Sequence, residues 1–129
     1  MQLKTLLEIY AATAAVICLN FLAIPGFWIH LYGAQADTQA VFLYRLIATL
    51  FGGLAVMAWS GRAAEAPATR ETMVRGLVVT NGLAALVAVL GAASGVYNQF
   101  AWGPAAMFAG FTLALLGATP TSPPSRTPS

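Results

Sequence analysis

Four long apolar stretches alternate with short polar or aromatic segments along the chain. The stretches cover about residues 3–24, 38–60, 72–93 and 100–118. Each is close to the ~20 residues that an α-helix needs to cross the hydrocarbon core of a bilayer. Since backbone polar groups must be paired inside a membrane, such stretches fold as helices. The pattern predicts an all-α, polytopic membrane domain over residues 1–118, built as an antiparallel bundle of four transmembrane helices with short connections.

Turn-forming and capping residues mark where the predicted helices end. Pro25 and Gly26 end the first stretch, and the aromatic segment after them predicts a short interfacial helix or turn that stops at Gly33. Asp37 or Thr38 can cap the second helix, because either side chain accepts a hydrogen bond from a free backbone amide.

Both ends of the chain need a separate interpretation. The first stretch has Lys4 before an apolar run, as a signal peptide does, but the run exceeds the usual length of about 7–15 residues and contains Glu8. We therefore expect a retained transmembrane helix. Residues 119–129 are rich in Pro, Ser and Thr, a composition that builds no core and predicts a disordered tail.

The composition excludes a soluble fold. Of the 129 residues, 59% are hydrophobic and only 8% are charged, whereas soluble domains carry roughly 25% charged residues. A small domain leaves much of its chain at the surface, so it could not keep this much apolar area from water. The net charge of +2 is too small and too scattered for nucleic-acid binding. The single cysteine, Cys18, cannot form an internal disulfide.

The basic residues predict the orientation of the bundle. Four spans place the amino terminus, the connection between the second and third helices and the tail on one side. That side holds Lys4, Arg62, Arg70, Arg75 and Arg126. The connections at 25–37 and 94–99 hold no Lys or Arg, so the positive-inside rule places both termini in the cytoplasm. The aromatic residues of these two connections then lie together on the outer side.

Small residues at four-residue spacing predict where helices approach one another, since lipid provides no hydrophobic drive between helices. The third stretch carries the longest such row, and the second and fourth carry shorter ones. The candidate packing positions are Gly52, Gly53, Gly76, Thr80, Ala84, Ala88 and Gly110. Because Ala and Gly are abundant in this chain, some of these rows can also arise by chance.

Two charged residues lie inside the predicted spans. Arg45 is about 10 Å from the outer end, where an arginine is costly unless it snorkels or finds a partner. It can bond to carbonyls or to outer-end polar groups such as Asn20, or it can bind an anionic headgroup, a quinone-like carbonyl or another anion. Glu8 lies near the cytoplasmic end, where it can pair with Lys4 or, if burial keeps it protonated, handle a proton.

Four further residues are candidate contacts for a ligand or partner, namely Asn20, Asn81, His30 and Trp28. Asn20 and Asn81 are amides within spans and can hydrogen-bond between helices. His30, beside Trp28 and Tyr32, could ligate a haem, a chlorin or a metal, but a lone histidine without a second ligand is more typical of an interface residue. No set of His, Cys and Asp has metal-ligand spacing, and no catalytic arrangement is recognisable.

One segment resembles a known group of proteins. The second stretch, with YRLIATLFGGLAVMAW, has Arg45 early in the span and Gly52 and Gly53 near its middle. In this segment and in its four-span layout over residues 3–118, the chain resembles the broad DoxX-like group of small bacterial membrane proteins. The resemblance implies a four-helix bundle in a bacterial inner (cytoplasmic) membrane, in a group partly associated with oxidoreductase complexes. This chain lacks a cysteine pair for redox chemistry of its own.

Three classes of function follow from these features. The leading hypothesis is a non-enzymatic accessory or structural subunit of a membrane complex, or a self-associating bundle, with membrane lipids and other membrane subunits or itself as partners. No cofactor is predicted, although such a bundle could hold a lipid, a quinone or a pigment. The alternative is a small oligomeric transporter or channel with a polar path through Glu8, Asn81 and Arg45. A membrane-embedded enzyme ranks third, because one glutamate and one arginine at different depths make a poor active site.

Overall fold

The structure, a computed structural model, describes residues 2–118. Within this range the chain forms α-helices and one 3₁₀ turn, without a strand. The four long helices are α1 (Leu3–Ala23), α3 (Thr38–Arg62), α4 (Pro67–Ala93) and α5 (Trp102–Ala118). The two short elements are α2 (Pro25–Leu31) and the 3₁₀ turn η1 (Gln99–Ala101).

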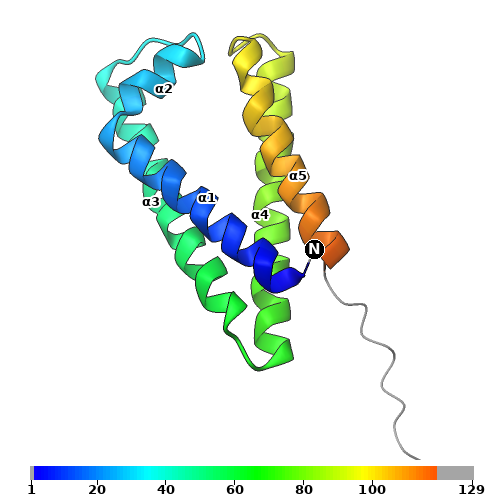
Figure 1. Ribbon diagram of the computed structural model, residues 1–129. Helices are drawn as coiled ribbons and strands as arrows, with labels where there is room; N and C mark the ends of the chain where they lie inside the picture. Colours follow the sequence, from blue (N-terminus) through cyan, green and yellow to red (C-terminus); the bar gives the residue numbers. More distant parts are fainter. Residues whose placement is uncertain (1, 119–129) are drawn as a thin grey trace, which may run out of the picture.

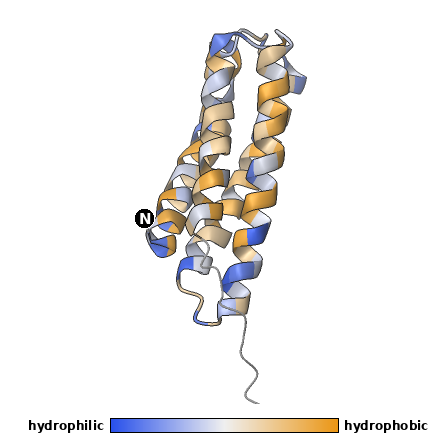
Figure 2. Cartoon of the chain, turned by 90° about the vertical axis from the view of Figure 1, so that its right-hand side faces the viewer, coloured by the Kyte–Doolittle hydropathy of each residue, from blue (hydrophilic) through white to orange (hydrophobic). Residues whose placement is uncertain are grey.

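The predicted all-α fold with four membrane-spanning helices is confirmed. The segments Leu3–Ala23, Thr38–Arg62, Pro67–Ala93 and Gln99–Ala118 are each long and apolar enough to cross a membrane. They run alternately up and down (Figure 1), and hydrophilic residues gather toward their ends (Figure 2). Many large apolar side chains along the helices are exposed, which suits a surface in contact with lipid. The chain is therefore a multi-pass membrane protein.

The starts of α3 and α4 are set by capping residues rather than by where the apolar stretches begin. α3 begins after Asp37, whose carboxylate accepts a hydrogen bond from the Ala40 backbone N–H at 2.7 Å, so the predicted cap is confirmed. α4 begins at Pro67 rather than at about residue 72. Proline suits this first position because its missing N–H would have had no helical partner there. The predicted tail at 119–129 lies outside the described residues.

The segment between α1 and α3 forms the expected short helix. α1 ends at Ala23 and α2 starts at Pro25, with Pro25 again in the first helical position. Gly33 follows α2 with a φ of +80°, a left-handed conformation that glycine adopts without strain. The chain can therefore turn sharply here toward the start of α3.

The two ends of the bundle differ in their side chains and are named accordingly. The basic end carries Lys4, Arg62, Arg70 and Arg75. The aromatic end comprises α2, η1 and the residues beside them, including Phe27, Trp28, Tyr32, Tyr97 and Phe100. The ring centroids of Tyr32 and Tyr97 are 6.3 Å apart. The prediction that the two aromatic connections lie together is thus confirmed.

The four long helices are arranged as two pairs. α1 packs along α3, and α4 packs along α5, while contact between the pairs is less extensive. Figure 1 shows the pairs close together toward the basic end and farther apart toward the aromatic end. The buried core accordingly lies in the basic half, and its central residues include Leu7, Tyr10, Ala58, Leu77 and Leu115. The aromatic half is less completely filled by side chains.

Only one of the predicted packing glycines brings two helices together within this chain. A Cβ atom at Gly52 would lie 3.3 Å from the Cys18 sulfur, so this glycine lets α3 approach α1 closely. Gly53, Gly76 and Gly110 have nothing within 4 Å of such an atom. These three therefore pack against no other helix among residues 2–118, and their contact with another chain stays a prediction.

On α4 the predicted small-residue row lies partly on the surface. Gly76 and Thr80 are exposed, whereas Ala84 and Ala88 are half-buried. The residues that α4 buries are instead Val74, Leu77 and Asn81. In the basic half, where the pairs are close together, these larger side chains face the other pair in place of the small-residue row.

Candidate ligand-binding cavity

A cavity of about 470 Å³ lies between the two helix pairs in the aromatic half. Its volume falls in the range of small-molecule sites, roughly 300–1,000 Å³. Seven of its fifteen lining residues are aromatic, namely Phe21, Trp28, Tyr32, Tyr44, Phe51, Tyr97 and Phe108. Aromatic residues make up only 11% of the whole chain, so this cavity concentrates them.

The aromatic rings of the wall contact one another. The Phe21 ring of α1 lies 5.0 Å from Tyr44, 6.0 Å from Trp28 and 6.3 Å from Phe51, measured between centroids. Tyr44 and Phe51 are about two turns apart on α3 and therefore share a face. Because Phe21 contacts rings from both α2 and α3, it connects three helices. Edge-on and tilted ring contacts of this kind fix the orientation of the wall.

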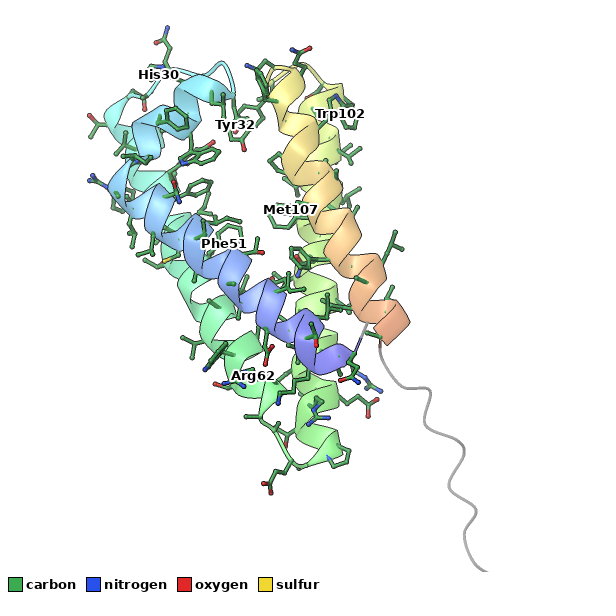
Figure 3. All side chains as sticks on the ribbon, viewed as in Figure 1. His30, Tyr32, Phe51, Arg62, Trp102 and Met107 are labelled. Atoms are coloured by element: carbon green, nitrogen blue, oxygen red, sulfur yellow. The ribbon has the colours of Figure 1, made fainter. Side chains whose placement is uncertain are left out.

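The floor of the cavity is apolar. It is formed by Ile17, Phe51, Met107 and Phe108, and Figure 3 shows Phe51 and Met107 on opposite sides of the space between the pairs. The Phe51 and Phe108 rings are nearly parallel, with an interplanar angle of 18° and centroids 6.1 Å apart. The same four residues also line a second cavity of about 10 Å³ that reaches Asn81. This second space is about large enough for one water molecule.

Polar groups of the wall are gathered toward the aromatic end. They come from Asn20, Tyr32, Tyr44 and Tyr97. No hydrogen bond within the part of the chain that the structure describes engages the hydroxyl of any of these tyrosines. Burial raises the pKa of the Tyr32 hydroxyl above its ordinary value, so this group stays protonated near neutral pH and can donate a hydrogen bond.

The indole of Trp28 is held among other rings. Its centroid lies 5.4 Å from that of Phe27 and 6.5 Å from that of Tyr32. The Nε1 atom is enclosed by protein and has no hydrogen-bond partner among residues 2–118. Trp28 therefore contributes to the cavity through its apolar ring surface.

One asparagine connects the two helix pairs at the aromatic end. The Asn98 side-chain amide donates to the Leu31 carbonyl at 2.8 Å, and its backbone N–H donates to the Tyr32 carbonyl at 3.1 Å. Its side-chain oxygen accepts from the Phe100 backbone N–H at 3.1 Å and caps η1. Gly33 permits this approach, because a Cβ atom there would lie 3.2 Å from Asn98 Nδ2.

Two of the six predicted contact residues line the cavity and four do not. Asn20 and Trp28 are part of the wall. Arg45 and His30 are exposed, and neither lines the cavity. Among residues 2–118 no hydrogen bond joins Arg45 to Asn20, and the Asn20 amide donates to the carbonyl of Val16 in its own helix. Arg45 follows Tyr44 directly, and neighbouring residues on a helix point in different directions.

Glu8 pairs with a different basic residue from the one expected. Its carboxylate lies 3.6 Å from the Arg62 guanidinium of α3, so the predicted pairing with Lys4 is wrong. The same guanidinium lies 3.6 Å from the centroid of the Trp59 ring, a cation–π contact. Figure 3 shows Arg62 at the basic end, well separated from His30 at the aromatic end.

Asn81 lies in the core and is 1% exposed. Its Nδ2 atom donates to the Tyr10 hydroxyl at 2.9 Å and to the Leu77 carbonyl at 2.8 Å, as expected for an inter-helix amide. Glu8, Asn81 and Arg45 therefore occupy three separate places: an ion pair, the core and the outer surface. Of the three, only Asn81 borders either the main cavity or the small one, so neither cavity forms the predicted polar path within residues 2–118.

Most of the cavity wall was missed by reasoning from the sequence. Tyr44 and Phe51 share one face of α3, and this spacing is visible in the sequence. Phe21 and Phe108 come from helices whose neighbours only the fold establishes. No group of three or more His, Cys, Asp and Glu residues in the described range could hold a metal ion.

No protein-family model, curated protein or solved structure matches the chain.

Proposed function

We propose that this chain is a non-enzymatic integral membrane protein that holds a small apolar molecule, such as a lipid, a quinone or a pigment, between its helix pairs. The concentration of aromatic side chains around about 470 Å³ of space carries this proposal. Unfilled space in a packed interior forfeits contact energy. A cavity of this size is therefore costly to the bundle unless a ligand fills it.

The ligand enters from the bilayer rather than from water. Val16 and Ile47 line the cavity, yet their side chains are 58% and 39% exposed on the apolar surface of the bundle. At the aromatic end, by contrast, the hydrogen bonds of Asn98 and the contact between Tyr32 and Tyr97 connect the two pairs. An apolar molecule dissolved in lipid can thus reach the cavity without crossing a polar surface.

Binding fits the lining better than catalysis does. The side chains around the cavity offer phenol, indole and amide groups, but no carboxylate, imidazole, thiol or amine. General acid–base or nucleophilic catalysis would have to rest on the phenols alone, since the wall has no carboxylate, imidazole or amine that could activate them. A protein of this kind can carry its molecule as an accessory subunit of a larger membrane complex.

The proposed location is a bacterial inner membrane, with the basic end in the cytoplasm. The distribution of Lys4, Arg62, Arg70 and Arg75 supports this orientation, because such residues are retained on the cytoplasmic side. Protease protection of a tag after residue 129 in sealed vesicles of known orientation tests it. Cleavage of the tag from the outside of intact cells would contradict it.

Filling the cavity tests the proposed function. Ala88 of α4 is half-buried and lines the cavity, so Ala88→Phe places a ring in the space of the ligand. With fluorene as the probe, nanodiscs containing the protein should bind more than empty nanodiscs. Ala88→Phe should lower the affinity about tenfold or more, since forcing a ring into an occupied site costs at least ~1.4 kcal/mol.

The matched control is Ala12→Phe, which adds the same ring at an exposed position of α1 outside the cavity. This variant should bind fluorene as the wild type does. If wild-type protein adds nothing to the binding by empty nanodiscs, or if the two variants behave alike, the proposed function is wrong.

A second candidate function is association with another copy or another subunit through α5. Gly103, Ala106, Gly110 and Ala114 form a row on this helix and are all exposed. A Cβ atom at Gly103 or Gly110 would meet nothing within 4 Å. Small residues at this spacing let the backbone of a second helix approach closely. The two functions are compatible, because the row and the cavity involve different residues.

A further inference from the structure

The polar and apolar parts of the cavity are separated along the bundle. The hydroxyls of Tyr32 and Tyr44 belong to the part near the aromatic end, and Figure 3 shows the Tyr32 side chain pointing into the space between the helix pairs. The opposite part is the floor of Phe51, Met107 and Phe108. A molecule that fills this space meets hydrogen-bonding groups at one end and rings or aliphatic chains at the other.

We propose that the occupant is a flat ring compound with a hydrogen-bond acceptor at one end only, such as a ring ketone, and that the hydroxyls of Tyr32 and Tyr44 donate to this acceptor. This inference rests on the proposed function and names the ligand class of the same site. Neither hydroxyl has a hydrogen bond within residues 2–118. A carbonyl of a ligand in the cavity gives them an acceptor away from water.

The floor requires the other end of the ligand to be apolar. Phe51, Met107 and Phe108 have no N–H or O–H group to donate. Beyond them, both hydrogens of Asn81 Nδ2 are already used by Tyr10 and the Leu77 carbonyl, and the Tyr10 hydroxyl lies outside the main cavity. A second carbonyl at the far end, as in a para-quinone, would be buried without a partner, which costs free energy.

The walls favour a ring over a flexible acyl chain. Phe51 and Phe108 are nearly parallel at the floor, and the Phe21 ring faces the same space from α1. Aromatic surfaces gain extra stabilisation from offset or edge-on contact with another ring. A rigid ring also loses less conformational freedom on binding than an acyl chain does.

Two tricyclic probes of the same shape test the donor assignment. 9-Fluorenone carries one ring carbonyl, and fluorene has a CH₂ group in its place. In protein-containing nanodiscs, measured against empty nanodiscs, fluorenone should bind more tightly than fluorene. The double variant Tyr32→Phe, Tyr44→Phe keeps both rings and should weaken fluorenone binding about 3- to 10-fold, the range expected for a lost hydrogen bond. Fluorene binding should not change.

Tyr10→Phe is the matched control, because the Tyr10 hydroxyl already accepts from Asn81 and lies outside the main cavity. It should leave both affinities unchanged. Equal binding of fluorene and fluorenone that survives the double variant would overturn the ligand class while leaving the proposed function intact. Absence of binding by both probes would instead refute the proposed function.

A third probe tests whether the ligand carries an acceptor at one end only. The probe 2,3-dimethyl-1,4-naphthoquinone, with carbonyls at opposite edges, should bind more weakly than fluorenone, and tighter binding would overturn the one-ended assignment.

Discussion

At the level of single residues, the bond between Asn81 and Tyr10 is the polar contact that joins the two helix pairs inside the core. Asn81 belongs to α4 and Tyr10 to α1, and both are almost fully buried. The Asn81 side-chain oxygen has no partner within the described part of the chain, and it borders the small cavity of about 10 Å³. A single water there would satisfy this oxygen.

Replacing either Asn81 or Tyr10 should lower the free energy of unfolding of the bundle. Replacing both should lower it by less than the sum of the two single effects. Asn81→Leu leaves the buried Tyr10 hydroxyl without its donor, whereas Tyr10→Phe leaves Asn81 with its bond to Leu77. We expect a coupling free energy of about 0.6–2 kcal/mol between the two sites, as for other inter-helix hydrogen bonds in membranes. Unfolding in mixed detergent micelles, measured for both single variants and the double variant, gives this value. Strict additivity would show that the bond contributes nothing.

At the level of elements, the helices could be predicted from the sequence and their contact faces could not. Hydropathy and length identify a span without reference to its neighbours, which is why all four spans were found. The sequence does not show, however, whether a given glycine faces another helix or the lipid. Gly52 packs against Cys18, while the adjacent Gly53 is open. The start of α4 was misplaced because its first turns are polar and lie before the apolar stretch.

The exposed row on α5 should drive self-association if the second candidate function is correct. Gly110→Leu fills the middle of the row and should weaken dimerisation about tenfold or more, since close backbone approach is lost. Gly53→Leu is the matched control, because Gly53 is equally open but its exposed neighbours on α3, Val56 and Met57, are large. Energy transfer between labelled copies in vesicles measures both. Equal dimerisation of the two variants would exclude α5 as the interface.

At the level of the whole molecule, the core and the cavity divide the bundle along its length. The basic half is filled by Leu7, Leu77, Leu115 and their neighbours, while the aromatic half encloses about 470 Å³. This division could not be predicted from the sequence, because it depends on how far the helix pairs separate. The candidate residues chosen for their charge, Arg45 and Glu8, lie outside the cavity, and tyrosines and phenylalanines form its wall.

The bond between Asn98 and α2 should control how fast a ligand leaves the cavity. It connects the pairs at the end where they are farthest apart, so its loss lets them separate there more often. Asn98→Ala should raise the dissociation rate of fluorene from nanodiscs about 3-fold or more, in keeping with one lost hydrogen bond. It should also speed hydrogen exchange of the backbone amide of residue 98, which donates to the Tyr32 carbonyl. Ser94→Ala is the control, because the Ser94 hydroxyl bonds only to the Gly91 carbonyl of its own helix. An unchanged dissociation rate in Asn98→Ala, with hydrogen exchange accelerated as expected, would show that separation of the pairs at the aromatic end does not widen the route past Val16 and Ile47 into lipid.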